Sequence, residues 1–235
     1  MKYEDYKDKI VREFASWEKS DATYKGYLNS LNNGRNVWLN ANRAVERAGE
    51  KMSSLLREIA NSDIAYEDLR RLTAEEYRFL FNHSSNIGAI AQRLTNEAAD
   101  IHMTVKFPKI DDSRIDGLLE ILTRDHDNNI LLSLSEVYND GIGYNIAQDS
   151  INELIGYNSR IQNKAGFNTY MVRRTDGHCC EWCDKVADGV AYRKGEEPDD
   201  FWRFHDNCTC WIEYKVDKRI DIVSYKTRNG KMTKA

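Results

Sequence analysis

The cysteines of this chain are confined to one short stretch near its C-terminal end. All five lie between residues 179 and 210 of a 235-residue chain. The metal-binding groups in this stretch form two clusters, Cys180-x2-Cys183 and, after a gap of 21 residues, His205-x2-Cys208-x-Cys210. Tetrahedral zinc takes four Cys or His ligands, usually as two short-spaced pairs that a longer loop joins. The spacing therefore predicts one structural zinc ion.

Three of these side chains are the best candidate ligands: Cys180, Cys183 and Cys208. The fourth position is contested between His205 and Cys210, and either would complete a tetrahedral set. We expect Cys179 to be a spare thiol, because adjacent cysteines rarely point at the same ion.

Two other uses of these thiols remain open. Five cysteines can form two disulfides with one thiol left over, but charged residues 2–12 follow Met1 where a signal peptide would have an apolar core. A catalytic thiol with His205 as its base is the other alternative. A nucleophile requires a single cysteine, whereas this stretch holds five close together, so we prefer zinc.

Charge and hydropathy limit the class of protein. Charged residues make up 31% of the chain and its mean hydropathy is −0.70, as expected for a soluble protein with much exposed helical surface. No apolar run approaches the ~18 residues of a membrane helix, so we expect no membrane partner. The net charge of −4 argues against a general nucleic-acid binder. Residues 215–235 nevertheless hold seven Lys or Arg against two Asp, a basic tail that can contact phosphate or an acidic partner.

Apolar residues at helical spacing dominate the first two thirds of the chain. Ile10, Phe14 and Trp17 predict a helix over 4–17, and Asn32-Asn33-Gly34 predicts a turn. An apolar seam then alternates steps of three and four, which predicts one long helix with a narrow apolar face. The seam consists of Trp38, Ala41, Val45, Ala48, Met52, Leu55 and Ile59.

Local signals predict breaks after this helix. Thr73-Ala-Glu-Glu76 resembles a capping box that opens a new helix, and residues 82–86 (NHSSN) are expected to interrupt it. A further helix is expected from there to about Met103. His83 and His102 are expected to be packing or surface histidines, because neither has a second ligand at chelating spacing.

The next segments are also expected to be mainly helical. Residues 105–112 with Pro108 predict a connector. A cap at Asp111 or Asp112 is expected to open a helix with Ile115, Leu118, Leu119 and Leu122, and another amphipathic piece is expected at 130–138. Asp125-His126-Asp127 is interpreted as a helix-end cluster. Gly141 and Gly143 are expected to loosen the chain before a last helix that carries Ile146 to Ile161.

Alternating apolar and polar residues replace the helical pattern after Gly166. Residues 167–174, 189–192 and 210–216 predict short strands, and the last would begin at a metal ligand. We therefore predict a mainly α, α+β protein, with an elongated helical body (1–165), a small β-rich zinc-knuckle module (166–216) and a basic tail (217–235). Metal binding is expected to contribute much of the module's folding free energy, because so few residues bury little apolar area alone.

Several of these segments together resemble a known family. They are DDSRIDGLLEIL from Asp111, IQNKAGF from Ile161, Val172-Arg-Arg, GHCCEWCDKVADG and WRFHDNCTCWIEY. This set resembles the minor head (minor capsid) proteins of tailed phages, the group related to the head-morphogenesis protein F of phage Mu, over roughly residues 105–216. The family usually has Arg between the last two cysteines, where this chain has Thr209, and Cys179 is additional.

The resemblance implies a structural virion protein and no enzyme. Its expected place is the head near the portal, after assembly in the host cytoplasm, with portal and/or major capsid protein as partners. Packaged DNA is a further expected partner, through the basic tail, and the protein is expected to act in head assembly and in DNA packaging or delivery. The residues agree, because we find no phosphate-cradling glycine loop, paired-carboxylate motif or nucleophile elbow.

Two alternative functions remain. His205-Asp206-Asn207 beside the cysteines would suit a metal-dependent nuclease or hydrolase, although a closed four-ligand zinc leaves no position for water. Trp182, Trp202 and Trp211 with Arg203 would suit a zinc knuckle that binds nucleic acid by stacking. Tryptophans beside a zinc site more often supply its apolar packing.

Overall fold

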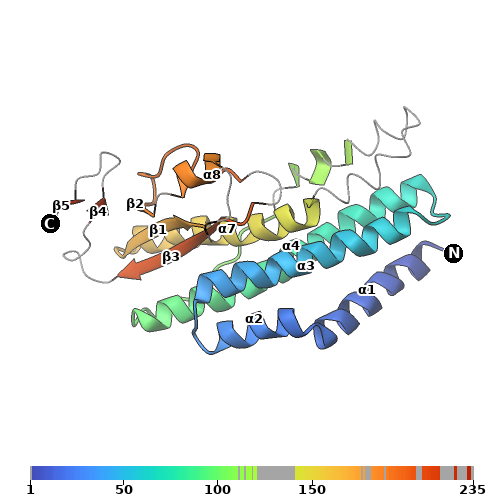
Figure 1. The fold of residues 1–235 in the computed structure, drawn as a ribbon, viewed down its shortest axis with the longest axis horizontal. Coiled ribbons are helices and arrows are strands. Elements are labelled where there is room, and N and C mark those ends of the chain that lie inside the picture. The colour runs from blue at the N-terminus through green and yellow to red at the C-terminus, as the bar shows by residue number, and fades with distance from the viewer. Residues whose placement is uncertain are drawn as a thin grey trace.

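Long helices lie side by side in an elongated body, and a small antiparallel sheet covers one end of them (Figure 1). This computed structural model describes residues 2–110, 112–113, 115–117, 119–120, 141–175, 177, 181–187, 189–204, 208–217, 225–226 and 232–233. The described residues are mainly helical with a small sheet, so the expected α+β class is confirmed.

Along the chain, the long helices come first and the strands follow, with one short helix among the strands. The helices are α1 (Tyr3–Ser20), α2 (Ala22–Asn32), α3 (Val37–Ala60), α4 (Tyr66–Ala98), α7 (Ile142–Lys164) and α8 (Glu181–Val186). The strands are β1 (Asn168–Arg174), β2 (Ala191–Arg193), β3 (Trp211–Asp217), β4 (Tyr225–Lys226) and β5 (Met232–Thr233). None of the described helices is both long and apolar enough to cross a membrane.

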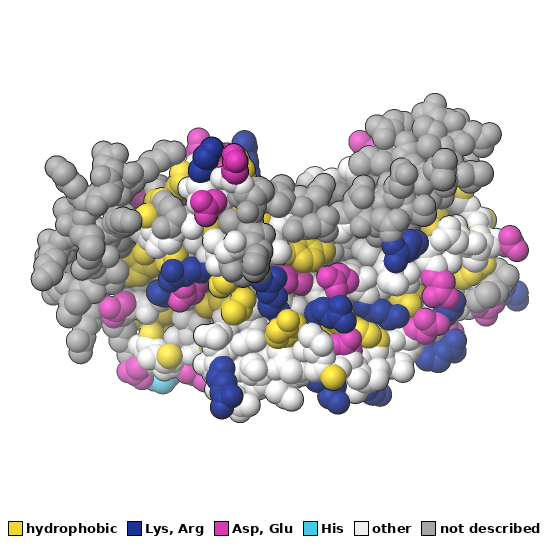
Figure 2. Space-filling model, viewed as in Figure 1, with side chains coloured by type: hydrophobic (Ala, Val, Ile, Leu, Met, Phe, Trp, Pro, Cys, Tyr) yellow, Lys and Arg dark blue, Asp and Glu magenta, His cyan; other side chains and the backbone are white. Residues whose placement is uncertain are grey.

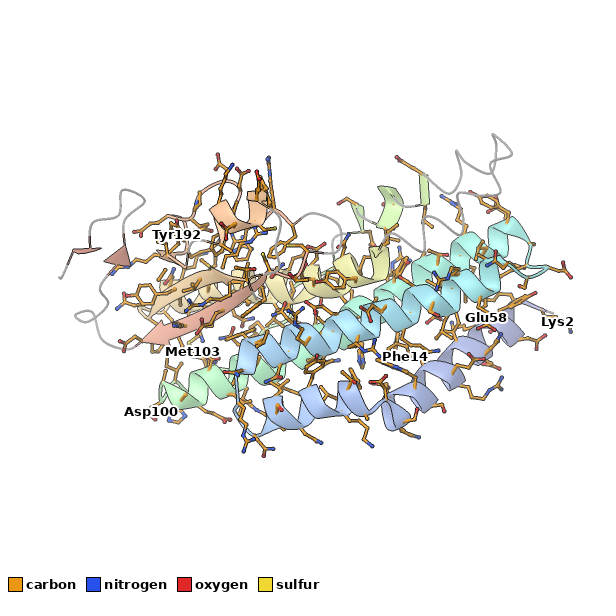
Figure 3. All side chains as sticks on the ribbon, in the orientation of Figure 1. Lys2, Phe14, Glu58, Asp100, Met103 and Tyr192 are labelled. Carbon is orange, nitrogen blue, oxygen red and sulfur yellow. The ribbon has the colours of Figure 1, made fainter. Side chains whose placement is uncertain are left out.

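Helices α1 and α3 agree with the predicted pattern, whereas α2 was not predicted. Asp21 ends α1 and caps α2, where its carboxylate accepts a hydrogen bond from the Tyr24 amide at 2.7 Å. The predicted turn is confirmed, since Gly34 and Asn36 both adopt positive φ between α2 and α3. All seven residues of the apolar seam are buried on α3. Figure 3 labels Phe14, which is buried on α1 and packs into the same core.

The predicted breaks at 73 and at 82–86 are wrong, because α4 is one continuous helix. Thr73 does not cap: it is buried in the helix interior, and its hydroxyl donates to the carbonyl of Leu69 at 2.8 Å. Apolar residues on both sides of each predicted break, among them Leu72, Tyr77 and Phe81, lie in the same core. Their burial favours a continuous helix over the local capping signal.

The end of α4 also differs from the prediction. The helix ends at Ala98 rather than near Met103, and Asp100 with φ of 53° turns the chain into a non-helical connector. Both histidines behave as expected. The His83 ring nitrogen lies 3.0 Å from the Tyr24 hydroxyl, and the His102 side chain is 90% exposed.

The two glycines before the last long helix have different roles. Gly141 adopts φ of 75° at the start of α7. We expected Gly143 to loosen the chain as well, and this expectation is wrong. Gly143 lies inside α7 against Gly49 of α3, and a Cβ on Gly49 would come within 2.5 Å of the Gly143 carbonyl oxygen. Two residues without side chains therefore let the backbones of α3 and α7 approach closely.

The sheet has the order β2-β1-β3 with antiparallel pairing, and the three predicted strands are confirmed with ends shifted by one or two residues. Met171 at its centre pairs with Tyr192 on one side and Tyr214 on the other. Side chains alternate between faces along a strand. Arg173 therefore lies on the same face as Met171 and Tyr214.

The sheet and the helices share one hydrophobic core. Met171, Ile212 and Tyr214 belong to the same buried cluster as the residues of α3 and α4. Within the expected basic tail, β4 and β5 pair as a separate two-stranded sheet. Positive and negative side chains intermix on the face that Figure 2 shows.

Some predicted features can be placed only in part. Ile115 and Leu119 are buried, and the amide of Asp116 donates to the carbonyl of Asp112 at 2.8 Å, as expected for a helix that begins there. The remaining features lie outside the described residues: Leu118, Leu122, the cluster at 125–127 and the piece at 130–138.

Candidate metal centre

Three cysteine thiols from the two predicted clusters meet in the interior. Cys183, Cys208 and Cys210 are fully buried, and their Sγ atoms all lie within 4.8 Å of one another. The Sγ atoms of Cys183 and Cys208 are 3.3 Å apart. A tetrahedral ion with Zn–S bonds of about 2.3 Å requires S···S separations of roughly 3.8 Å. The three thiols therefore have a geometry that can hold a metal ion.

The other candidates for this centre lie outside the described residues. These are Cys180, His205 and the expected spare thiol Cys179. Cys210, which competes with His205 in the sequence, lies in the thiol cluster. In the part of the chain that the structure describes, no second group of three Cys, His, Asp or Glu has the geometry to hold a metal.

Two short elements bring the thiols together. Cys183 lies in α8, and the carbonyl of Cys183 accepts a hydrogen bond from the Ala187 amide at 2.7 Å where that helix ends. Cys208 and Cys210 immediately precede β3, so the strand begins one residue after the last thiol rather than at it. The pairing of β3 with β1 therefore starts directly after the thiol cluster in the chain.

A buried arginine lies beside the sulfurs, and sequence reasoning gave it no role. Arg173 of β1 is 1% exposed, and its Nη2 lies 3.9 Å from Cys183 Sγ and 3.8 Å from Cys208 Sγ. Both faces of β1 are buried along its middle, so the alternation of side chains along the strand did not mark Arg173. A guanidinium at this distance favours thiolate over thiol and offsets the negative charge that several thiolates bring to a metal.

The same guanidinium also holds the chain that leads into the second cluster. Arg173 Nη1 donates to the carbonyl oxygens of Asp200 at 3.3 Å, Phe201 at 3.0 Å and Arg203 at 2.5 Å. Its carbon centre lies 4.0 Å from the centre of the Phe204 ring and 5.2 Å from the Trp182 ring. Arg173 therefore connects β1, the 200–204 loop and the sulfurs.

Hydrogen bonding shifts the pKa values of two of the thiols in opposite directions. The pKa of Cys208 is lowered, mainly because the Cys210 thiol donates to it, and the nearby Arg173 charge acts in the same direction. The pKa of Cys210 is raised by that shared hydrogen bond and by burial. Because metal ligands must be deprotonated, binding would release the remaining thiol protons.

Helix α7 anchors the backbone of the second cluster. The Tyr144 hydroxyl donates to the carbonyl oxygen of Cys208, and Gln148 Nε2 donates to those of Cys208 at 3.3 Å and Cys210 at 2.5 Å. In Figure 1, α7 lies between α8 and the α3–α4 pair. The thiol cluster is therefore fastened to the helical body by side chains of α7.

The anchor extends to α3 through a buried carboxyl group. Glu46 Oε1 lies 3.0 Å from the Tyr144 hydroxyl, and Oε2 is 2.7 Å from Arg43 Nη1. Burial raises the pKa of Glu46 to about 7. Since a hydroxyl has one proton to donate, a protonated Glu46 would donate to Tyr144 while Tyr144 donates to Cys208. No sequence motif marks this chain of contacts.

The three tryptophans near the centre have partners within the fold. Trp182 faces Arg173, as described above. Trp202 packs across Gly156 of α7, and its Nε1 donates to Glu197 at 2.9 Å. Trp211 is partly buried against the core. These contacts are those of packing residues.

Comparisons of this chain with protein-family models, with curated proteins and with solved structures found no match.

Proposed function

We propose that this protein is a structural component of a tailed-phage head in which one zinc ion fastens the C-terminal sheet to the helical body. The observation that carries the zinc site is the cluster of three buried thiols. The carbonyls of Cys208 and Cys210 accept hydrogen bonds from α7, and the sulfurs of Cys183 and Cys208 lie beside Arg173. The fourth ligand would be Cys180 or His205.

The surroundings of the thiols favour a structural site over a catalytic one. Each of the three cysteines is fully buried, and Trp182, Ala187 and Phe204 pack against them. A structural zinc site is closed by four protein ligands, whereas a catalytic site keeps a position open for water. Burial on this scale leaves little room for a substrate at the metal.

The assembly role rests on the resemblance of residues 105–216 to tailed-phage minor head proteins. The partners we propose are portal and/or major capsid protein, with packaged DNA contacting the basic tail. The proposed location is the virion head.

The metal is tested on the purified full-length chain by native mass spectrometry and elemental analysis. We expect one zinc ion per chain in the wild type, and its loss in Cys183→Ser. Cys179→Ser is the matched control and should retain the metal. A folded chain without metal, with these sulfurs free or bridged to one another, would contradict the zinc proposal.

The assembly role is tested by expressing the chain together with portal and major capsid proteins of the phage that encodes it. We expect the chain to enter procapsids, and its deletion to lower infectious yield. Exclusion from procapsids would contradict the assembly role. Metal-dependent hydrolysis of phosphodiesters by the purified chain would support the nuclease or hydrolase alternative instead.

A further inference from the structure

The strand β3 pairs with another strand on only one of its two sides. In the sheet order β2-β1-β3, all seven of its residues pair with β1, in an unbroken register from Trp211 to Asp217. Within the part of the chain that the structure describes, no strand pairs with its other side, the outer edge of β3. An edge strand can bind an extended segment of another chain through the backbone groups on such a side.

A groove runs along the outer edge of β3. Its volume is about 790 Å³, and six of the seven residues of β3 line it, over a length of roughly 20 Å. In Figure 1, β3 lies at the margin of the sheet that is nearest to α3. The start of α3 and the end of α4 form the opposite wall, which includes the apolar residues Val37, Leu39, Leu94 and Ala98. A segment in the groove would therefore have to present apolar side chains to the helices.

The two faces of β3 differ in chemistry. Three alternate residues of the strand are buried in the core that the sheet shares with the helices: Ile212, Tyr214 and Val216. Glu213 and Lys215 lie between them on the opposite face, where their side chains are 30% and 51% exposed and their charged groups are 3.1 Å apart. The strand therefore has an apolar inner face and an outer face with one negative and one positive charge.

These properties make β3 complementary to a second copy of itself. When two copies run antiparallel with Tyr214 of one opposite Tyr214 of the other, Glu213 of each copy lies opposite Lys215 of the other. The same register places Ile212 opposite Val216, so the apolar faces of both copies lie on the same side. A lysine on an edge strand ordinarily opposes such pairing, whereas in this register each lysine meets a carboxylate.

We infer that β3 binds β3 of a second copy of this chain, which joins the two three-stranded sheets into one continuous sheet. The contact is the same on both copies, as in other two-fold dimers, so the pair of Glu213 with Lys215 occurs twice. The second copy supplies what the outer edge and the groove require: an extended backbone, an apolar face toward the helices and opposite charges on the other face. The inference does not depend on the role in phage assembly.

Charge reversal tests the pairing on the purified full-length chain, whose dimer dissociation constant is measured by sedimentation. Lys215→Glu places two carboxylates opposite each other twice, and Glu213→Lys does the same with two lysines. We expect each variant to raise the dissociation constant about tenfold or more, because like charges directly opposite each other destabilise paired strands. An equimolar mixture of the two variants should dimerise again, since every charge then faces its opposite.

Two controls accompany the reversal. Arg12→Glu, at an exposed position of α1, changes the net charge as much as Lys215→Glu does and should leave the dissociation constant unchanged. Because Glu213 also pairs with Arg174 at 2.7 Å, circular dichroism and Tm must show that Glu213→Lys is folded. If it is not, hydrogen exchange of the wild type decides: as the protein concentration rises, alternate backbone amides of β3 should gain protection.

Four results would overturn the inference. They are a wild type that stays monomeric at every soluble concentration, a dimer that both folded variants leave unchanged, a mixture of folded variants that does not associate, and a dimer without added protection in β3. Protection of β3 that appears only when portal or major capsid protein is added would assign the outer edge to a different partner, and would also overturn it.

Discussion

The helical body and the sheet end of this molecule are held together by different means. In the body, α3 presents a continuous apolar seam to α4 and α7, and two glycines let the backbones of α3 and α7 meet. At the sheet end, the strands join the same apolar core, and a buried arginine, three thiols and a set of backbone carbonyls form a second, polar centre beside it. Apolar burial is favourable without any ion, whereas clustered thiolates repel one another unless a cation lies between them. The sheet end should therefore depend on metal far more than the body does.

Removal of the metal is expected to have the largest effect. Cys208→Ser should abolish metal binding, a loss on the order of 10 kcal/mol in small zinc domains. We expect hydrogen exchange to accelerate in β1 and β3 while α3 and α4 stay protected, and a strong chelator should reproduce the pattern in the wild type. Equal loss of protection in the helices would show that the two regions unfold as one unit.

A substitution at the glycine contact tests the stability of the helical body without changing the metal site. Gly49→Ala places a Cβ within 2.5 Å of the Gly143 carbonyl, so α3 and α7 must separate, at a cost of about 1–3 kcal/mol or more. Urea unfolding followed by helical circular dichroism measures it. Gly26→Ala in α2 is the control, because its Cβ would meet nothing within 4 Å. That variant should be neutral or slightly stabilising.

Replacement of Arg173 sharpens the comparison at the sheet end. Arg173→Met removes the charge beside the sulfurs. Mutation of a residue that contacts metal ligands typically lowers metal affinity by about 10- to 100-fold. Competition with a chromogenic chelator measures the change. Arg174→Met is the control on the same strand, because Arg174 pairs with Glu213 at the partly exposed face. Equal affinities in the two variants would contradict the role we assign to Arg173.

The smallest predicted effect is a pH dependence of the body. Burial raises the pKa of both Glu46 and Glu76 to about 7, above their usual value of 4.5. The folded state then binds more protons than the unfolded state between these pH values. The stabilisation is fully present below pH 4.5 and is lost as the pH rises through about 7.

Glu46→Gln and Glu76→Gln separate the two contributions. Each variant should flatten part of the decline when unfolding of the metal-free chain is followed by helical circular dichroism from pH 4.5 to 7.5. Only Glu46→Gln should also alter hydrogen exchange at Cys208 and Cys210, because Tyr144 connects Glu46 to the Cys208 carbonyl. A flat pH profile in the wild type would show that these carboxyl groups ionise normally.

Prediction from sequence succeeded where the signal was local and repeated. The seam of α3 contains seven apolar residues at helical spacing, and all seven are buried. The three strands carry their own alternation, and each lies within two residues of its predicted ends. It failed at Thr73 and at residues 82–86, where a capping motif and a polar run competed with burial on both sides. A local motif carries about 1 kcal/mol, whereas several buried apolar side chains contribute more.

The sequence by itself determined that two thiol clusters exist and that helices precede a small sheet, since spacing and periodicity are properties of neighbouring residues. Only the tertiary structure decided that Cys183 meets Cys208 and Cys210, that Arg173 lies inside beside them, and that Tyr144 and Gln148 fasten them to α7. The close contact of Gly49 with Gly143 is of the same kind. Each of these contacts joins residues that are distant in the chain, and their meeting depends on how whole elements pack.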